Sequence, residues 1–298
     1  MSERNRLAFG LARRLFALLA IAAIAAYLCL HRDQLAGLLQ QARVSNLVLA
    51  GVLFALLHLI IAAGYWSVQA AVGVHRPLSS ALDSYITRLP ARYIPGGVWH
   101  AFSRYLDLHE RQQADKRSLL RVFLLENGIV GATGLALAAL ALVSVQPAEH
   151  SYPAAAGLAA MLLAGLLVLA LVMRGLHPRP APRALGVAIV LLSLNWLGVA
   201  LAFALFFSGL ATTSTCSLSV AGASYLAAAS LGFVAVFAPQ GWGVAEFVLA
   251  LLHPCAVSAP VAVAALTGFR IVGALADSAL FVSWRVLHAL RRSGAAQD

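Results

Sequence analysis

Long runs of apolar residues, separated by short polar breaks, dominate the chain. A helix needs about 20 apolar residues to cross the hydrocarbon core of a bilayer. The pattern therefore predicts an all-α, polytopic transmembrane helical bundle with about seven spans. We place these spans at residues 13–31, 46–72, 118–145, 154–174, 184–209, 220–238 and 258–289.

Two further segments do not fit this description. Residues 78–107 are too polar and too interrupted for an ordinary span, and residues 239–253 are apolar but short. Pro90, Pro95 and Pro239 break these segments, because proline cannot continue the interior of a helix. We expect both to be re-entrant or half-helix elements, and 239–253 to enter and leave by one face.

The composition supports a membrane protein. Hydrophobic residues make up 61% of the 298 positions and charged residues only 11%, whereas soluble globular chains carry about 25% charged residues. The longest polar stretch, 103–117, is too short to fold alone. We therefore expect residues 1–298 to form one integral membrane domain with no soluble domain.

The formal net charge is +10, from 21 Lys and Arg against 11 Asp and Glu. The basic residues lie in the breaks between apolar runs, so the positive-inside rule explains them better than nucleic-acid binding does. The N-terminus, 73–121, 174–183 and the C-terminal tail should be cytoplasmic, while 146–153 and 210–219 should face outside. Anionic lipid headgroups are the natural partners of such basic loops.

The first broken segment has the features of a phosphate site. Arg88, Arg92 and Arg104 flank Gly96 and Gly97, after which a helix can restart. Free N–H groups at a helix start bind anions, and Arg matches phosphate bidentately. This predicts a lipid phosphate site; the alternative is a basic interfacial helix whose Arg side chains contact bulk headgroups.

The second broken segment repeats the pattern with Gly241, Gly243 and a carboxylate, Glu246, in the first helical turn. The helix dipole alone could account for that carboxylate, although charges inside a membrane are usually functional. Trp242 is expected to be an interface anchor, with the wall of a pocket as the alternative. Two broken helices in the two halves of a chain are typical of a transporter site.

Other charged residues lie within the apolar runs. We expect Arg270 to pair with Glu246 or Glu126, because a buried charge needs a partner. Arg270, Glu246 and Glu126, together with Gly241 and Gly243, are candidates for lining a cavity or for coupling transport to proton movement. For Asp277, seven residues after Arg270, a purely structural role is the better interpretation.

The chain has three cysteines, Cys29, Cys216 and Cys255, without metal-binding or redox spacing. We interpret them as small buried apolar residues. The nine histidines include no HxxxH or HExxH pair, so no metal site and no cofactor are expected. Sequence motifs of hydrolases and nucleotide-binding enzymes are absent, which favours a protein that is not an enzyme.

Four elements together resemble the lysylphosphatidylglycerol synthase transmembrane-region family, also called flippase-like. Tyr93–His100 resembles its Y-[IL]-P-G block, and Pro239–Glu246 its P-G-G-x-G-x-x-E block. Leu125–Asn127 resembles its L-E-R element, and Arg270 matches an Arg of its last helix. Gln240 stands where that pattern has Gly, and Asn127 where it has Arg.

This resemblance implies a lipid translocase in the bacterial cytoplasmic (inner) membrane. It implies an anionic phospholipid, a lipid-linked sugar or a hopanoid as cargo. The chain ends at Asp298 without the aminoacyl-transferase domain of full synthases, so we do not expect it to make lysylphosphatidylglycerol. A second copy of the chain or an envelope-synthesis protein is an expected partner.

Two alternative functions follow from the same residues. In a membrane enzyme of lipid or envelope-glycan synthesis, His100, Glu126 and Glu246 would be the acid–base groups. In a non-catalytic scaffold for such a synthase, the charged residues would tolerate Ala, while changes on the helix surfaces would abolish function.

Overall fold

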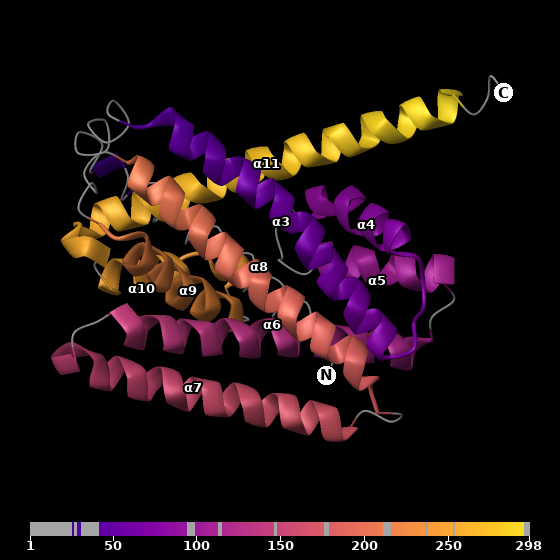
Figure 1. Cartoon of the computed structure of the whole chain (residues 1–298), viewed down its shortest axis with the longest axis horizontal. Helices are drawn as coiled ribbons and strands as arrows, with labels where there is room; N and C mark the ends of the chain where they lie inside the picture. The colour runs from indigo at the N-terminus through magenta and orange to yellow at the C-terminus, as the bar shows by residue number, and fades with distance from the viewer. Residues whose placement is uncertain are drawn as a thin grey trace.

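A computed structural model describes residues 26, 29–30, 42–93, 99–112, 115–145, 148–175, 179–210, 216–235, 238–252 and 254–294. Within these ranges all regular structure is helical, which confirms the all-α prediction (Figure 1). The elements are α3 (Val44–Ala71), α4 (Leu78–Thr87), η1 (Leu89–Tyr93), α5 (Trp99–Gln112), α6 (Lys116–Val145), α7 (Ala148–Gly175), α8 (Pro182–Gly209), α9 (Leu218–Val234), η3 (Pro239–Gly241), α10 (Val244–Leu252), η4 (Pro254–Ala256) and α11 (Ala259–Gly294).

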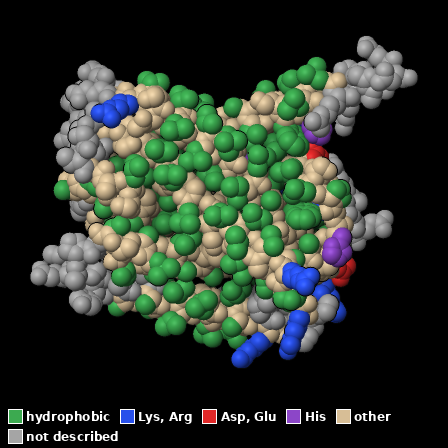
Figure 2. Space-filling view, viewed as in Figure 1, with side chains coloured by type: hydrophobic (Ala, Val, Ile, Leu, Met, Phe, Trp, Pro, Cys, Tyr) green, Lys and Arg blue, Asp and Glu red, His purple; other side chains and the backbone are tan. Residues whose placement is uncertain are grey.

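Four described helices, α3, α6, α8 and α11, are long and apolar enough to cross a membrane. The expected number of about seven spans is not confirmed. Most of the predicted span 13–31 lies outside the described residues, and 220–238 corresponds to α9, a helix of only 17 residues. Figure 2 shows hydrophobic side chains over most of the visible face, with Lys and Arg gathered mainly at its lower right edge.

The centre of the bundle is the antiparallel pair of α3 and α8. The backbone N–H of Arg43 donates to the carbonyl oxygen of Gly209 at 2.8 Å, and that of Ala181 donates to Ala71 at the same distance. These bonds tie the two helices at both ends. We refer to the two ends of the bundle as the Gly209 end and the Ala71 end.

The first broken segment folds at the Ala71 end. α4 has ten residues and η1 five, so neither approaches the length of a span. After the break, α5 brings Asp107 within 3.8 Å of Arg76, which precedes α4. The segment therefore turns back toward the end where it began. Gly96 and Gly97 lie outside the described residues.

The second broken segment folds at the Gly209 end as an antiparallel hairpin of α9 and α10. At its tip, Gly232 of α9 packs against the backbone of Gly241 and the side chain of Ala245. α10 has nine residues and runs back toward the start of α9. In Figure 1, α9 and α10 lie in the left half of the bundle, whereas α4 and α5 lie in the right half.

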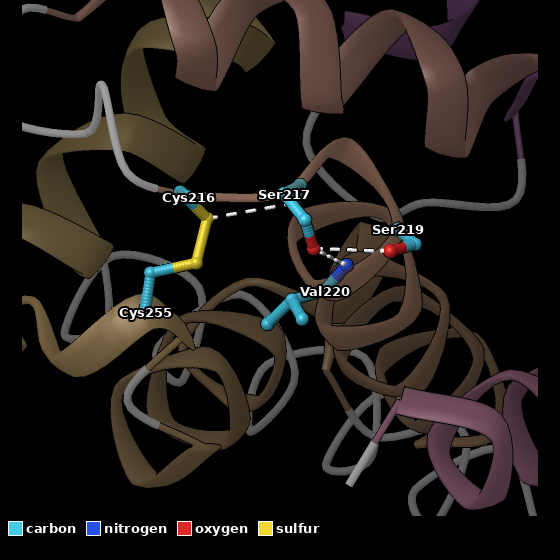
Figure 3. The surroundings of a disulfide bond; sticks show 5 residues. All are labelled: Cys216, Ser217, Ser219, Val220 and Cys255. Atoms are coloured by element: carbon cyan, nitrogen blue, oxygen red, sulfur yellow. Dashed lines mark hydrogen bonds between the residues drawn. A yellow bond between two sulfur atoms is a disulfide. The ribbon is translucent and has the colours of Figure 1, made fainter.

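A disulfide closes the open end of this hairpin. Cys216, just before α9, is bonded to Cys255 in η4, with their Cα atoms 5.3 Å apart (Figure 3). The interpretation of the three cysteines as buried apolar residues is wrong, since these two are bonded and Cys29 is exposed. The spacing of 39 residues along the chain contains no hint of this pairing, because the hairpin alone brings the two positions together.

Candidate functional site

The two broken segments, which come from opposite ends of the bundle, contact each other at the exposed Gln240 and the partly exposed Arg92. The side-chain amide of Gln240 donates a hydrogen bond to the backbone carbonyl oxygen of Arg92. Gln240 has a φ of 53°, a left-handed conformation that favours glycine. At Gly241, also left-handed, a Cβ atom would lie 2.7 Å from the backbone of Gly232, so only glycine allows this contact.

A first charged cluster surrounds Asp277 of α11, which is 1% exposed. The guanidinium of Arg92 lies 3.3 Å from its carboxylate, and the Tyr93 hydroxyl donates to the same oxygen, Oδ2, at 2.6 Å. His58 of α3 approaches the other oxygen, Oδ1, at 2.8 Å. Three elements, α3, η1 and α11, therefore meet at one carboxylate.

A second cluster pairs Arg104 of α5 with Glu126 of α6 at 3.1 Å, and both side chains are buried. The Tyr105 hydroxyl donates to the same carboxylate oxygen at 2.8 Å. The Arg104 guanidinium also lies over the ring of Tyr65, 4.2 Å from its centroid, in cation–π geometry. These contacts fix α5 against α3 and α6.

A third cluster joins α10 to α11. Glu246 lies 3.3 Å from Arg270, and its other oxygen accepts a hydrogen bond from the backbone N–H of Gly243 at 2.8 Å. The carboxylate thus caps the start of α10 and neutralises a cation of another helix. The guanidinium of Arg270 lies 4.5 Å from the ring centroid of Trp242, which makes this ring a wall of the cluster.

Arg88 lies at the Ala71 end, and Asp107 is 3.3 Å from it and 3.8 Å from Arg76. The Arg88 side chain is 37% exposed and reaches a polar pocket of about 410 Å³ between α4 and α11. The pocket is lined by Asp83, Thr87, Arg88, Trp284, Arg285, His288 and Ala289.

Several polar atoms of these clusters are buried without a hydrogen-bond partner among the described residues. They include Nε of Arg104, Nη1 of Arg270 and Oε1 of Glu126. A buried polar atom that lacks a partner costs about 1–3 kcal/mol. The clusters therefore retain hydrogen-bonding capacity that water or a polar headgroup can satisfy.

The expected pairing of Arg270 with a glutamate is confirmed, and the partner is Glu246; Glu126 pairs with Arg104 instead. The three arginines of the predicted phosphate site do not converge on one point, because each pairs with a different carboxylate. Gly241 and Gly243 shape the turn before α10 with positive φ values of 68° and 83°.

The sequence alone did not single out His58, and the structural role expected for Asp277 stays a prediction; the structure places the two side chains together. Both lie within apolar runs, where an ionisable side chain by itself indicates function. That signal could have identified the pair, but not its link to Arg92, which depends on the fold of the first break. Tyr65 and Tyr105 carried no sequence signal, whereas Tyr93 belongs to the block that resembles the family pattern.

No protein-family model matches the chain, and no curated protein matches it. The resemblance to the lysylphosphatidylglycerol synthase transmembrane-region family therefore stays a prediction that rests on the motif residues around the two breaks.

Proposed function

We propose that the protein is a lipid translocase that binds an anionic phospholipid or a lipid-linked phosphate and moves it across the bacterial cytoplasmic membrane. One observation carries this proposal: two broken segments from opposite ends of an apolar bundle meet at Gln240 and Arg92, among buried ion pairs. Broken helices that face each other are the usual framework of a transport site.

We propose six crossings and two re-entrant hairpins. The crossings are the segment 13–31 and helices α3, α6, α7, α8 and α11. An even number of crossings places both termini in the cytoplasm, as the loop charges favour, whereas seven would separate them. The Gly209 end, with its disulfide, would then face outside, where disulfides persist.

The ion pairs are suited to exchanging one anion for another. An unpaired arginine inside an apolar bundle is strongly destabilising, so each one needs a carboxylate when no ligand is bound. A lipid phosphate offers the same bidentate geometry and can replace that carboxylate. The side chains of Arg88 and Arg92 are 37% and 38% exposed, so a headgroup can reach them first.

The polar pocket beside Arg88 supplies an entrance at the cytoplasmic end in this proposal. Arg285 and His288 of α11 face it together with Arg88, and Asp83 is already bonded to the indole N–H of Trp284 at 3.0 Å. A basic pocket between membrane helices on the cytoplasmic side is a recognised type of site for anionic headgroups.

Headgroup flipping in reconstituted vesicles tests the function. Vesicles containing a fluorescent phosphatidylglycerol are exposed to a membrane-impermeant quencher, and the quenched fraction is followed with time. We expect the wild-type protein to flip the lipid and both Arg92→Ala and Glu246→Gln to slow flipping by about tenfold or more, the effect of a lost charged contact of about 1.4 kcal/mol.

Arg117→Ala is the matched control, because it removes the same charge from an exposed position at the start of α6. It should leave flipping unchanged. Equal rates in the wild type, Arg92→Ala and Glu246→Gln would contradict the mechanism, and a wild-type rate no faster than that of empty vesicles would contradict the function for this lipid. Mass spectrometry of co-purified lipids then shows which headgroup the protein retains.

A further inference from the structure

His58 and Asp277 form a closely paired acid and base inside the apolar bundle. His58 is 4% exposed and Asp277 1%, and Nε2 of the imidazole lies 2.8 Å from Oδ1 of the carboxylate. At that distance a proton on one of the two atoms is favoured, because two facing lone pairs would repel each other, and Oδ1 has no other hydrogen-bond partner among the described residues. The question is which group supplies that proton.

The other nitrogen of the ring decides how many protons the pair holds. Nδ1 of His58 lies 2.9 Å from the backbone carbonyl oxygen of Phe54, one helical turn earlier. A carbonyl oxygen only accepts hydrogen bonds, so Nδ1 must carry a hydrogen. The ring then needs a second proton on Nε2, or the carboxyl of Asp277 must be protonated. In both cases the pair holds one proton more than a neutral imidazole beside a carboxylate.

The groups that face this pair come from every element packed around it. Oδ2 of the carboxylate accepts from both Tyr93 and Arg92, which leaves Oδ1 for the imidazole. The Tyr85 ring centroid lies 5.9 Å from that of the imidazole. The titratable and charged neighbours are Tyr65 on α3, Tyr85 on α4, Arg92 and Tyr93 on η1, and Arg104 on α5, whose guanidinium lies over the Tyr85 ring.

The proton changes the net charge at the place where the two breaks meet. With the proton, His58, Asp277 and Arg92 together carry one positive charge; without it they are neutral. Inside a low-dielectric bundle a single net charge is a strong attraction for an anion. The backbone of Arg92 also contacts Gln240 of the second break, so the charge lies beside the contact between the two hairpins.

We propose that His58 and Asp277 form a proton-binding site within the bundle, and that its proton gives the cluster around Arg92 the positive charge that retains an anionic headgroup. Binding of the headgroup and binding of the proton then favour each other. The proton site stands on the geometry alone, whereas its coupling to a lipid rests on the proposed function. The proposed link between proton binding and headgroup binding therefore lies on α3 and α11, and not at Glu246 or Glu126.

Nitrogen NMR of the imidazole tests the proton site without any transport measurement. The protein is labelled with ¹⁵N-histidine, placed in lipid nanodiscs, and its His58 signals are assigned by their loss in His58→Gln and, separately, in His58→Asn. We expect a hydrogen on Nδ1 while the additional proton is bound, and a neutral ring with hydrogen on Nε2 only once base has removed that proton. A bare Nδ1 with hydrogen on Nε2 at all values from about pH 5 to about pH 9 would overturn the proposal.

Asp277→Asn provides the second variant. The amide donates to Nε2 but takes up no proton, so the additional proton should be lost while Nδ1 keeps its hydrogen. His288→Gln, at the mouth of the pocket, is the control and should leave the His58 signals unchanged. Retention of a doubly protonated ring in Asp277→Asn would show that the carboxylate does not hold the proton.

Flipping measured against pH tests the coupling. We expect the wild-type rate to change at the pH where the His58 signals change, and the profile of Asp277→Asn to be flat. A correct NMR result without any flipping would contradict the proposed function and leave the proton site standing. Flipping with the same pH profile in both proteins would contradict the coupling alone.

Discussion

At the scale of single residues, each buried charge that the structure places in the bundle interior has an opposite charge beside it. Glu126, Glu246 and Asp277 are each 1–2% exposed and lie against Arg104, Arg270 and Arg92. A buried ion pair adds little stability compared with apolar residues of the same volume, but breaking it by removing one partner is expensive. Stability alone therefore does not explain their presence, and the proposed function assigns them to binding or coupling.

The pair of Glu246 and Arg270 gives a direct test of this view. Glu246→Ala leaves a buried guanidinium unpaired, and we expect it to lower the free energy of unfolding by about 3–5 kcal/mol. The double variant Glu246→Leu with Arg270→Met removes both charges and should recover most of that loss. The measurement is unfolding by titration with a denaturing detergent.

The same two proteins should behave differently in transport. The double variant is expected to be folded but inactive in flipping, because the charges are gone while the packing remains. A double variant as unstable as Glu246→Ala would show that the pair is needed for packing, and an active double variant would remove Glu246 and Arg270 from the mechanism.

At the scale of elements, the apolar runs predicted the long helices α3, α6, α8 and α11 well, because length and hydropathy alone decide whether a helix can cross a bilayer. The run 220–238 was read as a full span for the same reason. Its role depends instead on where the chain goes afterwards, and α10 returns to the same end of the bundle. Window-based hydropathy carries no such information.

The sequence predicted most individual residues of the candidate site, but not which of them are in contact. Proline, glycine and charge marked both breaks, and the partner of Arg270 was found among two choices. The contacts of Arg92 with Asp277 and with Gln240 join residues 185 and 148 positions apart. Such contacts follow from how the two hairpins are packed, which no local pattern encodes.

The disulfide gives a prediction for the α9–α10 hairpin. In a soluble protein, closing a loop of this length raises the free energy of the unfolded chain by about 3–4 kcal/mol, because it removes conformational entropy. The effect is smaller in a membrane, which already limits the conformations of the unfolded chain. We expect Cys216→Ser and Cys255→Ser to lower the unfolding temperature in detergent to the same extent. The double variant should fall no further, because the bond is already lost in each single variant.

Cys29→Ser is the control, since Cys29 is exposed and unbonded. It should leave the unfolding temperature unchanged. A reducing agent should lower the stability of the wild type to that of Cys216→Ser and have no effect on the variant. Equal stability of the reduced and oxidised wild type would contradict a structural role for the bond.

At the scale of the whole molecule, the two hairpins approach each other from opposite ends, and α3 and α8 run between those ends (Figure 1). The ion pair of Arg92 and Asp277 lies beside the contact between Arg92 and Gln240, where the two hairpins meet. On the proposed function, a small movement of either hairpin would open this cluster toward one end of the bundle while the other hairpin still closes it, as alternating access requires.

The orientation of the bundle is tested with reporters. Green fluorescent protein becomes fluorescent in the cytoplasm, so fusions to the N-terminus and to the C-terminus should both be bright if the chain crosses the membrane six times. Labelling of intact cells with an impermeant thiol reagent should reach a cysteine placed at Ser219, at the start of α9, in a Cys29→Ser, Cys216→Ser, Cys255→Ser background. A dark C-terminal fusion beside a bright N-terminal one would instead support seven crossings.

The bond between Cys216 and Cys255 also bears on the order in which the molecule is assembled. Thiols are oxidised outside the cytoplasm and kept reduced within it. On the proposed orientation, the bond can form only after α8 has carried Cys216 across and Cys255 has followed through the hairpin. The newly made chain would therefore hold α9 and α10 by packing alone until both cysteines have crossed, and covalent closure would follow.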